Sequence, residues 1–242
     1  MALGSVTFMM MLFALYAIFF YAPIEKTMGI VQKIFYLHVP SAFFAFFAFL
    51  ITFIASILFL STKARKWDTI AVCSVEVGII FCTIVLTTGP IWAKPIWNVW
   101  WTWDPRLVTT LILWFIYVAY LMLRRVVEGN QRLNISAVLG IIGFVNVPLT
   151  FFTIRLWRSI HPVLITSRGI NINTPMKYTL LITAVAFCCL FIFLLVSRIR
   201  IETLKIKLEE VGEIMEEKVH LKWSQNQGQS SVLRPAIRVQ KS

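Results

Sequence analysis

Six long apolar stretches constrain how this chain can fold. They cover approximately Val6–Ala22, Pro40–Leu60, Ile70–Trp92, Leu107–Leu123, Ile135–Ile154 and Tyr178–Ser197. A helix needs roughly 20 predominantly apolar residues to cross the hydrocarbon core of a bilayer. Each stretch therefore predicts a transmembrane helix, and we expect an all-α, polytopic membrane protein with six transmembrane helices.

The overall composition agrees with lipid as the main solvent. Hydrophobic residues make up 59% of the 242 residues and charged residues only 14%, whereas a soluble domain is typically about 45–50% apolar and about 25% charged. A disordered chain, a disulfide scaffold and a free cytosolic enzyme are excluded on these grounds. The first stretch has no basic residues before it, so we interpret it as a retained span and not as a signal peptide.

The basic residues predict the orientation of the spans. Six spans place both termini on one side of the membrane, and 15 of the 23 Lys and Arg residues then lie on that side. Because basic residues mark the cytoplasmic side, both termini are expected in the cytoplasm. The net charge of +12 is thus explained without a nucleic-acid partner. Four of the eight basic residues on the outer side lie in the loop after the fifth span, where the rule disfavours them, and they suggest an anionic ligand on the outer face.

The composition changes abruptly at about residue 200. We expect a six-span domain over residues 1–200 and a cytoplasmic tail over residues 201–242. Apolar residues recur at three- and four-residue steps from Ile201 to Met215, which predicts an amphipathic helix over about residues 201–222. That helix is either a solvated extension of the last span or a partner-binding helix. The polar run after Trp223 predicts disorder.

Two histidines lie at the outer ends of different spans. His38 precedes the second span and His161 follows the fifth, each close to a proline. Each is either an interfacial side chain with a satisfied hydrogen bond or one of two axial ligands to a haem iron. In the second case the nearby cations are candidates to bind the haem propionates, since arginine in particular pairs bidentately with carboxylates. They are Arg106, Arg155, Arg158 and Lys33.

Tryptophans are concentrated between the third and fourth spans. Five of the nine in the chain fall within twelve residues, namely Trp92, Trp97, Trp100, Trp101 and Trp103. The cluster is either an aromatic belt at the bilayer interface, or its last four indoles, from Trp97 to Trp103, form a continuous platform for stacking on a flat conjugated macrocycle. Asp104 and Pro105 follow at once and predict the start of the fourth helix, with Asp104 as its N-cap. Arg106 is then either an interfacial anchor or part of the site.

Two features inside the spans also stand out. Glu76 lies about two turns into the third span, where an acid is costly and is a functional candidate by default. Asn146 and Pro148 predict a kink in the fifth span, because proline cannot donate a backbone hydrogen bond.

The segment WNVWWTWDPR closely resembles the tryptophan-rich WWD signature of the haem-handling proteins of cytochrome c maturation. The segments TGPIWAKPIW, KIFYLHVPSA and NVPLTFFTIRLWRSIHP are similar to the haem exporter protein C (CcmC) branch of that group. The resemblance covers about residues 10–197. It departs from the family at Pro105, where a small residue is common, and in its long tail.

This resemblance implies haem handling at the outer face of the inner membrane. His38 and His161 would ligate the iron of non-covalent haem b, and the segment from Trp97 to Asp104 would hold the macrocycle. The haem would pass to a periplasmic haem chaperone. An ATP-binding-cassette (ABC-type) ATPase, a second permease and a small single-span subunit would be the other partners. No covalent chemistry is implied, so we expect the protein not to be an enzyme. The alternatives are a b-type membrane cytochrome that oxidises quinol, and a small-molecule permease without haem.

Overall fold

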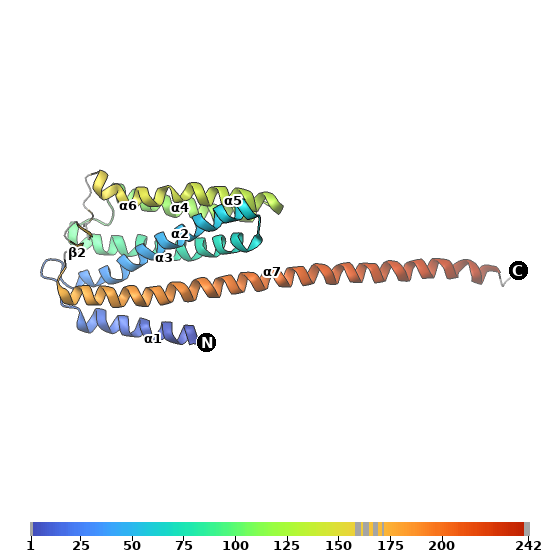
Figure 1. Ribbon diagram of the computed structural model, residues 1–242, viewed down its shortest axis with the longest axis horizontal. Helices are drawn as coiled ribbons and strands as arrows, with labels where there is room; N and C mark the ends of the chain where they lie inside the picture. Colours follow the sequence, from blue (N-terminus) through green and yellow to red (C-terminus); the bar gives the residue numbers. More distant parts are fainter. Residues whose placement is uncertain (1, 158–160, 162–164, 167–168, 171, 240–242) are drawn as a thin grey trace. The chain divides into compact units, whose positions relative to one another are not determined.

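The computed structural model describes residues 2–157, 161, 165–166, 169–170 and 172–239, and nearly all of them are helical (Figure 1). The elements are α1 (Ala2–Tyr16), the π-helix η1 (Ala17–Tyr21), the 3₁₀-helix η2 (Ile30–Ile34), α2 (Phe35–Thr62), α3 (Arg65–Trp97), α4 (Pro105–Val126), α5 (Gly129–Phe144), α6 (Asn146–Leu156), β1 (Ile165–Thr166), β2 (Gly169–Ile170) and α7 (Thr174–Val239). The all-α class is confirmed, and the short antiparallel pair of β1 and β2 adds a detail that the sequence did not suggest.

Six helical segments within the described ranges are long and apolar enough to cross a membrane, as predicted. They are Ala2–Tyr21, Ile30–Thr62, Arg65–Trp97, Pro105–Val126, Gln131–Thr153 and Thr174–Glu216. Each begins before the apolar stretch that predicted it, and four of the six also end after it. In those four, charged and aromatic residues at the ends of the span continue the helix while their polar groups reach the interface.

The chain divides into two compact units, Met1–Ile199 and Arg200–Ser242. In the second unit the apolar side chains of Ile201, Leu204 and Leu208 are exposed. The helix assigned there continues to Val239, beyond the end that we expected near residue 222, because a helix satisfies its backbone hydrogen bonds internally. Disorder after Trp223 and the cytoplasmic placement of this unit remain predictions.

The first unit is built on close packing between α2 and α3. Gly78 of α3 lies against Ala48 and Phe49 of α2, and a Cβ added to Gly78 would be only 2.6 Å from Phe49 Cε1 and 3.0 Å from Ala48 Cβ. Small residues at such contacts let transmembrane helices approach closely. A larger residue at position 78 would push the two helices apart.

Aromatic contacts attach the neighbouring helices to this pair. Phe49 of α2 stacks on Tyr117 of α4 with ring centroids 3.8 Å apart and planes 1° apart. Phe44 of α2 stacks on Phe191 of α7 at 5.5 Å. All four side chains are buried, so α2 is held by α3, α4 and α7 together.

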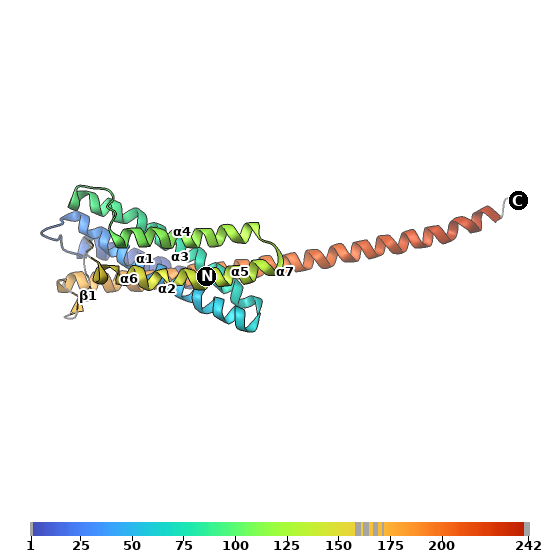
Figure 2. The same cartoon turned by 90° about the horizontal axis from the view of Figure 1, so that it is seen from above.

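The connections divide the first unit into two ends. The segment containing β1 and β2 lies at one end, and the α2–α3 and α4–α5 turns lie at the other (Figures 1 and 2). We call the end with β1 and β2 the cavity end, because a cavity lies there, and the other end the turn end. At the turn end α2 stops at Lys63, a residue with φ of 54° whose N–H donates to Phe59 O at 2.8 Å.

The fifth span is interrupted, as predicted. α5 ends at Phe144 and α6 begins at Asn146, and the side-chain amide of Asn146 donates to the carbonyl oxygen of Thr109 in α4 at 2.8 Å. Pro148 has no backbone N–H to donate at this break. The interruption therefore directs α6 along α4, the neighbour on which it packs.

The start of α4 also agrees with the prediction. Pro105 is the first helical residue, and Asp104 Oδ1 accepts a hydrogen bond from the backbone N–H of Arg106 at 2.9 Å. Asp104 is thus an N-cap, whatever else it does.

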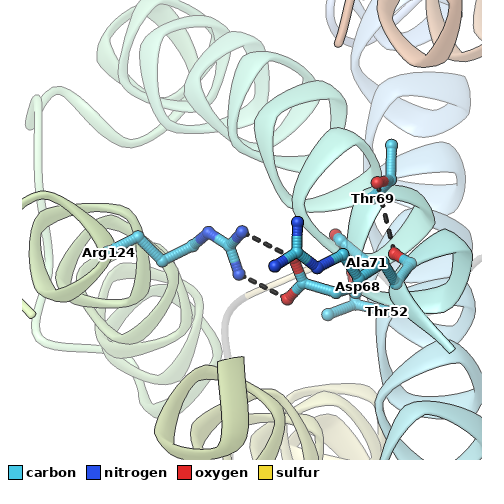
Figure 3. Close-up of polar contacts among 6 residues, drawn as sticks. Thr52, Asp68, Thr69, Ala71 and Arg124 are labelled. Carbon is cyan, nitrogen blue, oxygen red and sulfur yellow. Dashed lines mark hydrogen bonds and ion pairs between the residues drawn. The ribbon is translucent and has the colours of Figure 1, made fainter. Parts of the chain in front are cut away.

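Both acids of α3 form bidentate ion pairs with arginines of other helices. Asp68 accepts from Arg124 of α4 at 2.6 and 2.7 Å (Figure 3), and their side chains are only 10% and 12% exposed. Glu76 accepts from Nε and from a terminal nitrogen of Arg198 in α7. A paired carboxylate is tolerated at a depth where a lone one is costly, so the structure gives Glu76 a structural partner.

We expect Asp68→Asn to destabilise the protein by about 3 kcal/mol, because it leaves the buried Arg124 guanidinium without its counter-charge. Denaturant unfolding of the purified protein in detergent measures this. The control is Glu209→Gln, which breaks the exposed pair with Lys205 and should cost less than about 1 kcal/mol. Equal losses in the two variants would contradict a stabilising role for the Asp68–Arg124 pair.

We expect Asp104→Ala to lower stability by about 1 kcal/mol through loss of the N-cap. Asp104→Asn should remain close to the wild type, since asparagine caps as well as aspartate. The same unfolding measurement tests both variants, and an Asn variant as unstable as the Ala variant would show that the charge of Asp104 matters more than its cap.

Candidate functional site

A largely apolar cavity lies at the cavity end of the first unit, between α2, α3, α4 and α6 and the segment after α6. Its walls contain both candidate histidines. The lining residues are His38, Val39, Ala42, Phe43, Ala45, Phe46, Cys82, Val85, Leu86, Gly89, Pro90, Trp92, Ala93, Trp97, Trp101, Arg106, Leu107, Thr110, Phe151, Arg155 and His161.

The two histidine rings lie close together in the lining of this cavity. The ring centroids of His38 and His161 are 6.4 Å apart and their planes are inclined by 35°. Two imidazoles that each bind one metal ion through a nitrogen at about 2.0 Å have centroids about 6 Å apart. The spacing therefore suits one iron between them. His38 is buried and His161 is half-buried.

A hydrogen bond from α3 orients His38. Its Nδ1 lies 2.9 Å from the hydroxyl oxygen of Thr88, and Thr88 in turn donates to the carbonyl oxygen of Ile84 at 2.6 Å. The next residue is Gly89, where an added Cβ would lie 3.6 Å from Cε1 of His38. A Cβ at this position would make ordinary van der Waals contact with the imidazole, so α3 lies directly beside the ring here.

The tryptophans separate into two groups. Trp92, Trp97 and Trp101 line the cavity, and the buried Trp92 ring lies 6.0 Å from the His38 ring. Trp100 and Trp103 are 59% and 80% exposed and do not line it. Of the four indoles expected to form a platform, two therefore line this cavity and two lie outside it, in the non-helical segment 98–104. A platform of all four stays a prediction.

The charged candidates divide in a similar way. Arg106 and Arg155 line the cavity, whose described lining contains no acidic residue, and Arg155 lies over the ring of Phe151 at 5.7 Å. Asp104 caps α4 and is not a lining residue. Arg158 lies outside the described residues, so its place in the site stays a prediction.

Trp92 and Thr88 both lie beside His38. Trp92 belonged to the predicted tryptophan cluster but not to the segment from Trp97 to Asp104 that was expected to hold the macrocycle, and Thr88 was not among the predicted site residues. Trp92 had a signal, since it stands in the TGPIWAKPIW segment. Thr88 had none, because a threonine in an apolar span is usually bonded to its own helix. Only the packing of α2 on α3 places it beside His38.

Chemically, the cavity combines one imidazole pair, large aromatic surfaces and two cations. This set suits a flat, apolar, iron-containing molecule that carries acidic groups.

Comparison with known proteins agrees with this chemistry. Residues 1–212 match the sequence profile of the family described as Heme exporter protein C (CcmC). The chain is 31% identical over 193 residues to a Heme exporter protein C of Bradyrhizobium diazoefficiens, covering 78% of this chain and 73% of the relative.

Two further relatives show the spread of the similarity. A Heme exporter protein C of Paracoccus denitrificans is 32% identical over 193 residues, covering 78% of this chain and 80% of the relative. A ccmC-like mitochondrial protein of Marchantia polymorpha, named for cytochrome c biosynthesis, is 30% identical over 175 residues, covering 72% and 75%. The described residues contain six helices long and apolar enough to cross a membrane, and the family profile covers most of the chain, so this chain is a multi-pass membrane protein of the haem exporter protein C family.

Proposed function

We propose that this protein binds haem b non-covalently at the outer face of the membrane and presents it to an acceptor during cytochrome c maturation. The observation that carries the proposal is the pair of imidazoles 6.4 Å apart in an aromatic cavity. Family membership supports a role in haem handling.

The proposed axial ligands are His38 and His161. They come from separate elements. His38 is a buried residue near the start of α2, and His161 lies in the segment after α6. Each neutral imidazole would supply one nitrogen to the iron. Neither forms a covalent bond to the porphyrin, so release needs only the exchange of ligands.

The proposed partners of the propionates are Arg106 and Arg155, with Arg158 as a third candidate. A guanidinium in an apolar cavity favours a bound carboxylate, because the low local dielectric strengthens their attraction. The porphyrin itself would lie against Trp97 and Trp101. Trp100, Trp103 and Asp104 are proposed to act outside the cavity, on haem that is being handed over.

The proposed orientation places the cavity end outside. Both termini are then cytoplasmic. The turn end, which carries Lys63 and Arg124, also faces the cytoplasm, in agreement with the rule that basic residues mark that side. The acceptor would be a periplasmic haem chaperone. An ATP-binding-cassette ATPase, a second permease and a small single-span subunit would complete the assembly.

A quinol-oxidising cytochrome is the less favoured candidate. Electron transfer across a membrane needs more than one haem, hence more histidine pairs inside the spans. The chain has three histidines in all, and the third, His220, is in the tail.

We expect purified wild-type protein to bind hemin with a Soret band typical of two histidine ligands. His38→Ala and His161→Ala should each shift that band and weaken binding at least about 10-fold, since each removes one axial ligand. Optical titration measures both effects. Tyr178→Ala, an exposed residue of α7 that does not line the cavity, is the control. A wild-type protein without a Soret band, or histidine variants with its unchanged spectrum, would defeat the proposal.

The two tryptophan groups give a second test. Trp97→Ala and Trp101→Ala should weaken hemin retention, since each removes a stacking surface of about 1 kcal/mol. Trp100→Ala and Trp103→Ala should retain hemin as the wild type does, and should slow its transfer to the haem chaperone. Retention is measured by hemin loss to apomyoglobin. Equal loss from all four variants would indicate that exposure in the structure does not decide which indoles contact haem.

A further inference from the structure

We propose that Thr88 is a positioning residue for His38: its hydroxyl holds the imidazole with the proton on Nδ1, which leaves Nε2 as the nitrogen available to iron. The inference rests on the proposed function and adds to it a residue from another helix that selects the ligating atom.

The geometry provides the first step. His38 is on α2 and Thr88 is on α3, and the 2.9 Å contact between His38 Nδ1 and Thr88 Oγ1 joins them across the α2–α3 interface. His38 is 7% exposed, so water does not compete freely for this nitrogen. A buried imidazole keeps the orientation that its hydrogen-bond partner imposes.

The proton count provides the second step. The Thr88 hydroxyl has one proton, and its oxygen lies 2.6 Å from the carbonyl oxygen of Ile84. That short bond, of the kind threonine makes to the residue four positions earlier in a helix, commits the proton to Ile84. The Thr88 oxygen can then only accept from the imidazole, so Nδ1 carries the hydrogen and Nε2 carries the lone pair.

The energetic consequence follows from the chemistry of metal-bound histidine. A hydrogen bond from the non-ligating N–H fixes the tautomer and raises the basicity of the ligating nitrogen, and loss of such a partner typically weakens metal binding by about 10- to 100-fold. Thr88 therefore restrains the ring at Nδ1 and leaves the lone pair of the ring on Nε2.

The neighbouring Thr87 provides a matched control. Its hydroxyl is exposed and bonds to the carbonyl oxygens of Thr83 and Ile84 in its own helix. Thr87→Val thus removes a helix-bonded hydroxyl one residue away without touching the Thr88–His38 contact. Thr88→Val removes the hydroxyl at the same cost in helix propensity, and Thr88→Ser restores it.

The first experiment needs no haem. Nitrogen-15 NMR of the full chain, labelled at histidine and reconstituted in lipid, should show His38 protonated at Nδ1 in the wild type, in Thr87→Val and in Thr88→Ser. In Thr88→Val the two tautomers should become mixed. A wild-type His38 protonated at Nε2, or a Thr88→Val spectrum identical to the wild type, overturns the inference.

The second experiment adds hemin to the same four proteins. Thr88→Val should raise the dissociation constant about 10-fold and raise the midpoint potential, because a less basic imidazole stabilises ferric iron less. Thr88→Ser should restore both values. If hemin binding depends on His38 but the dissociation constants of Thr88→Val and Thr87→Val are equal, this inference alone is overturned. Wild-type protein that binds no hemin overturns the proposed function as well.

Discussion

The close approach of α2 and α3 is the constraint on which the rest of the first unit depends. It requires Gly78, since any side chain there would meet Phe49 and Ala48 at less than a normal contact distance. The same register places His38 of α2 opposite Thr88 and Trp92 of α3. The candidate ligand, its hydrogen-bond partner and one aromatic wall therefore all come from a single helix pair, and none of the three lies in a loop.

The other half of the cavity has a different origin. Arg106 follows the cap of α4, and Arg155 is in the last turn of α6, the helix that the break at Val145 redirects along α4. His161 lies beyond that helix. The site thus joins a tightly packed wall, which supplies one imidazole, to a wall of helix ends, which supplies the cations and the second imidazole.

Much of this arrangement could be predicted from the sequence, and the reasons for the rest are physical. Features that depend on neighbouring residues in the sequence were predictable. They are the spans, the cap at Asp104 and the break before Pro148. The directions of the tryptophans were not, because Trp100 and Trp103 lie where the helical period stops. The role of Thr88 and the partner of Glu76 depend on contacts between helices far apart in the chain.

The ion pair of Glu76 with Arg198 has a consequence for how the protein is made. The two residues are 122 positions apart, and a ribosome synthesises the N-terminal part first. α3 therefore enters the membrane with an acid whose counter-charge does not yet exist. The partner of Asp68 is in α4, the next span to be synthesised. Glu76 must stay beside water, or give up its charge, until the last span arrives, so docking of α7 is the late step in biogenesis that completes the assembly of α3 among its neighbours.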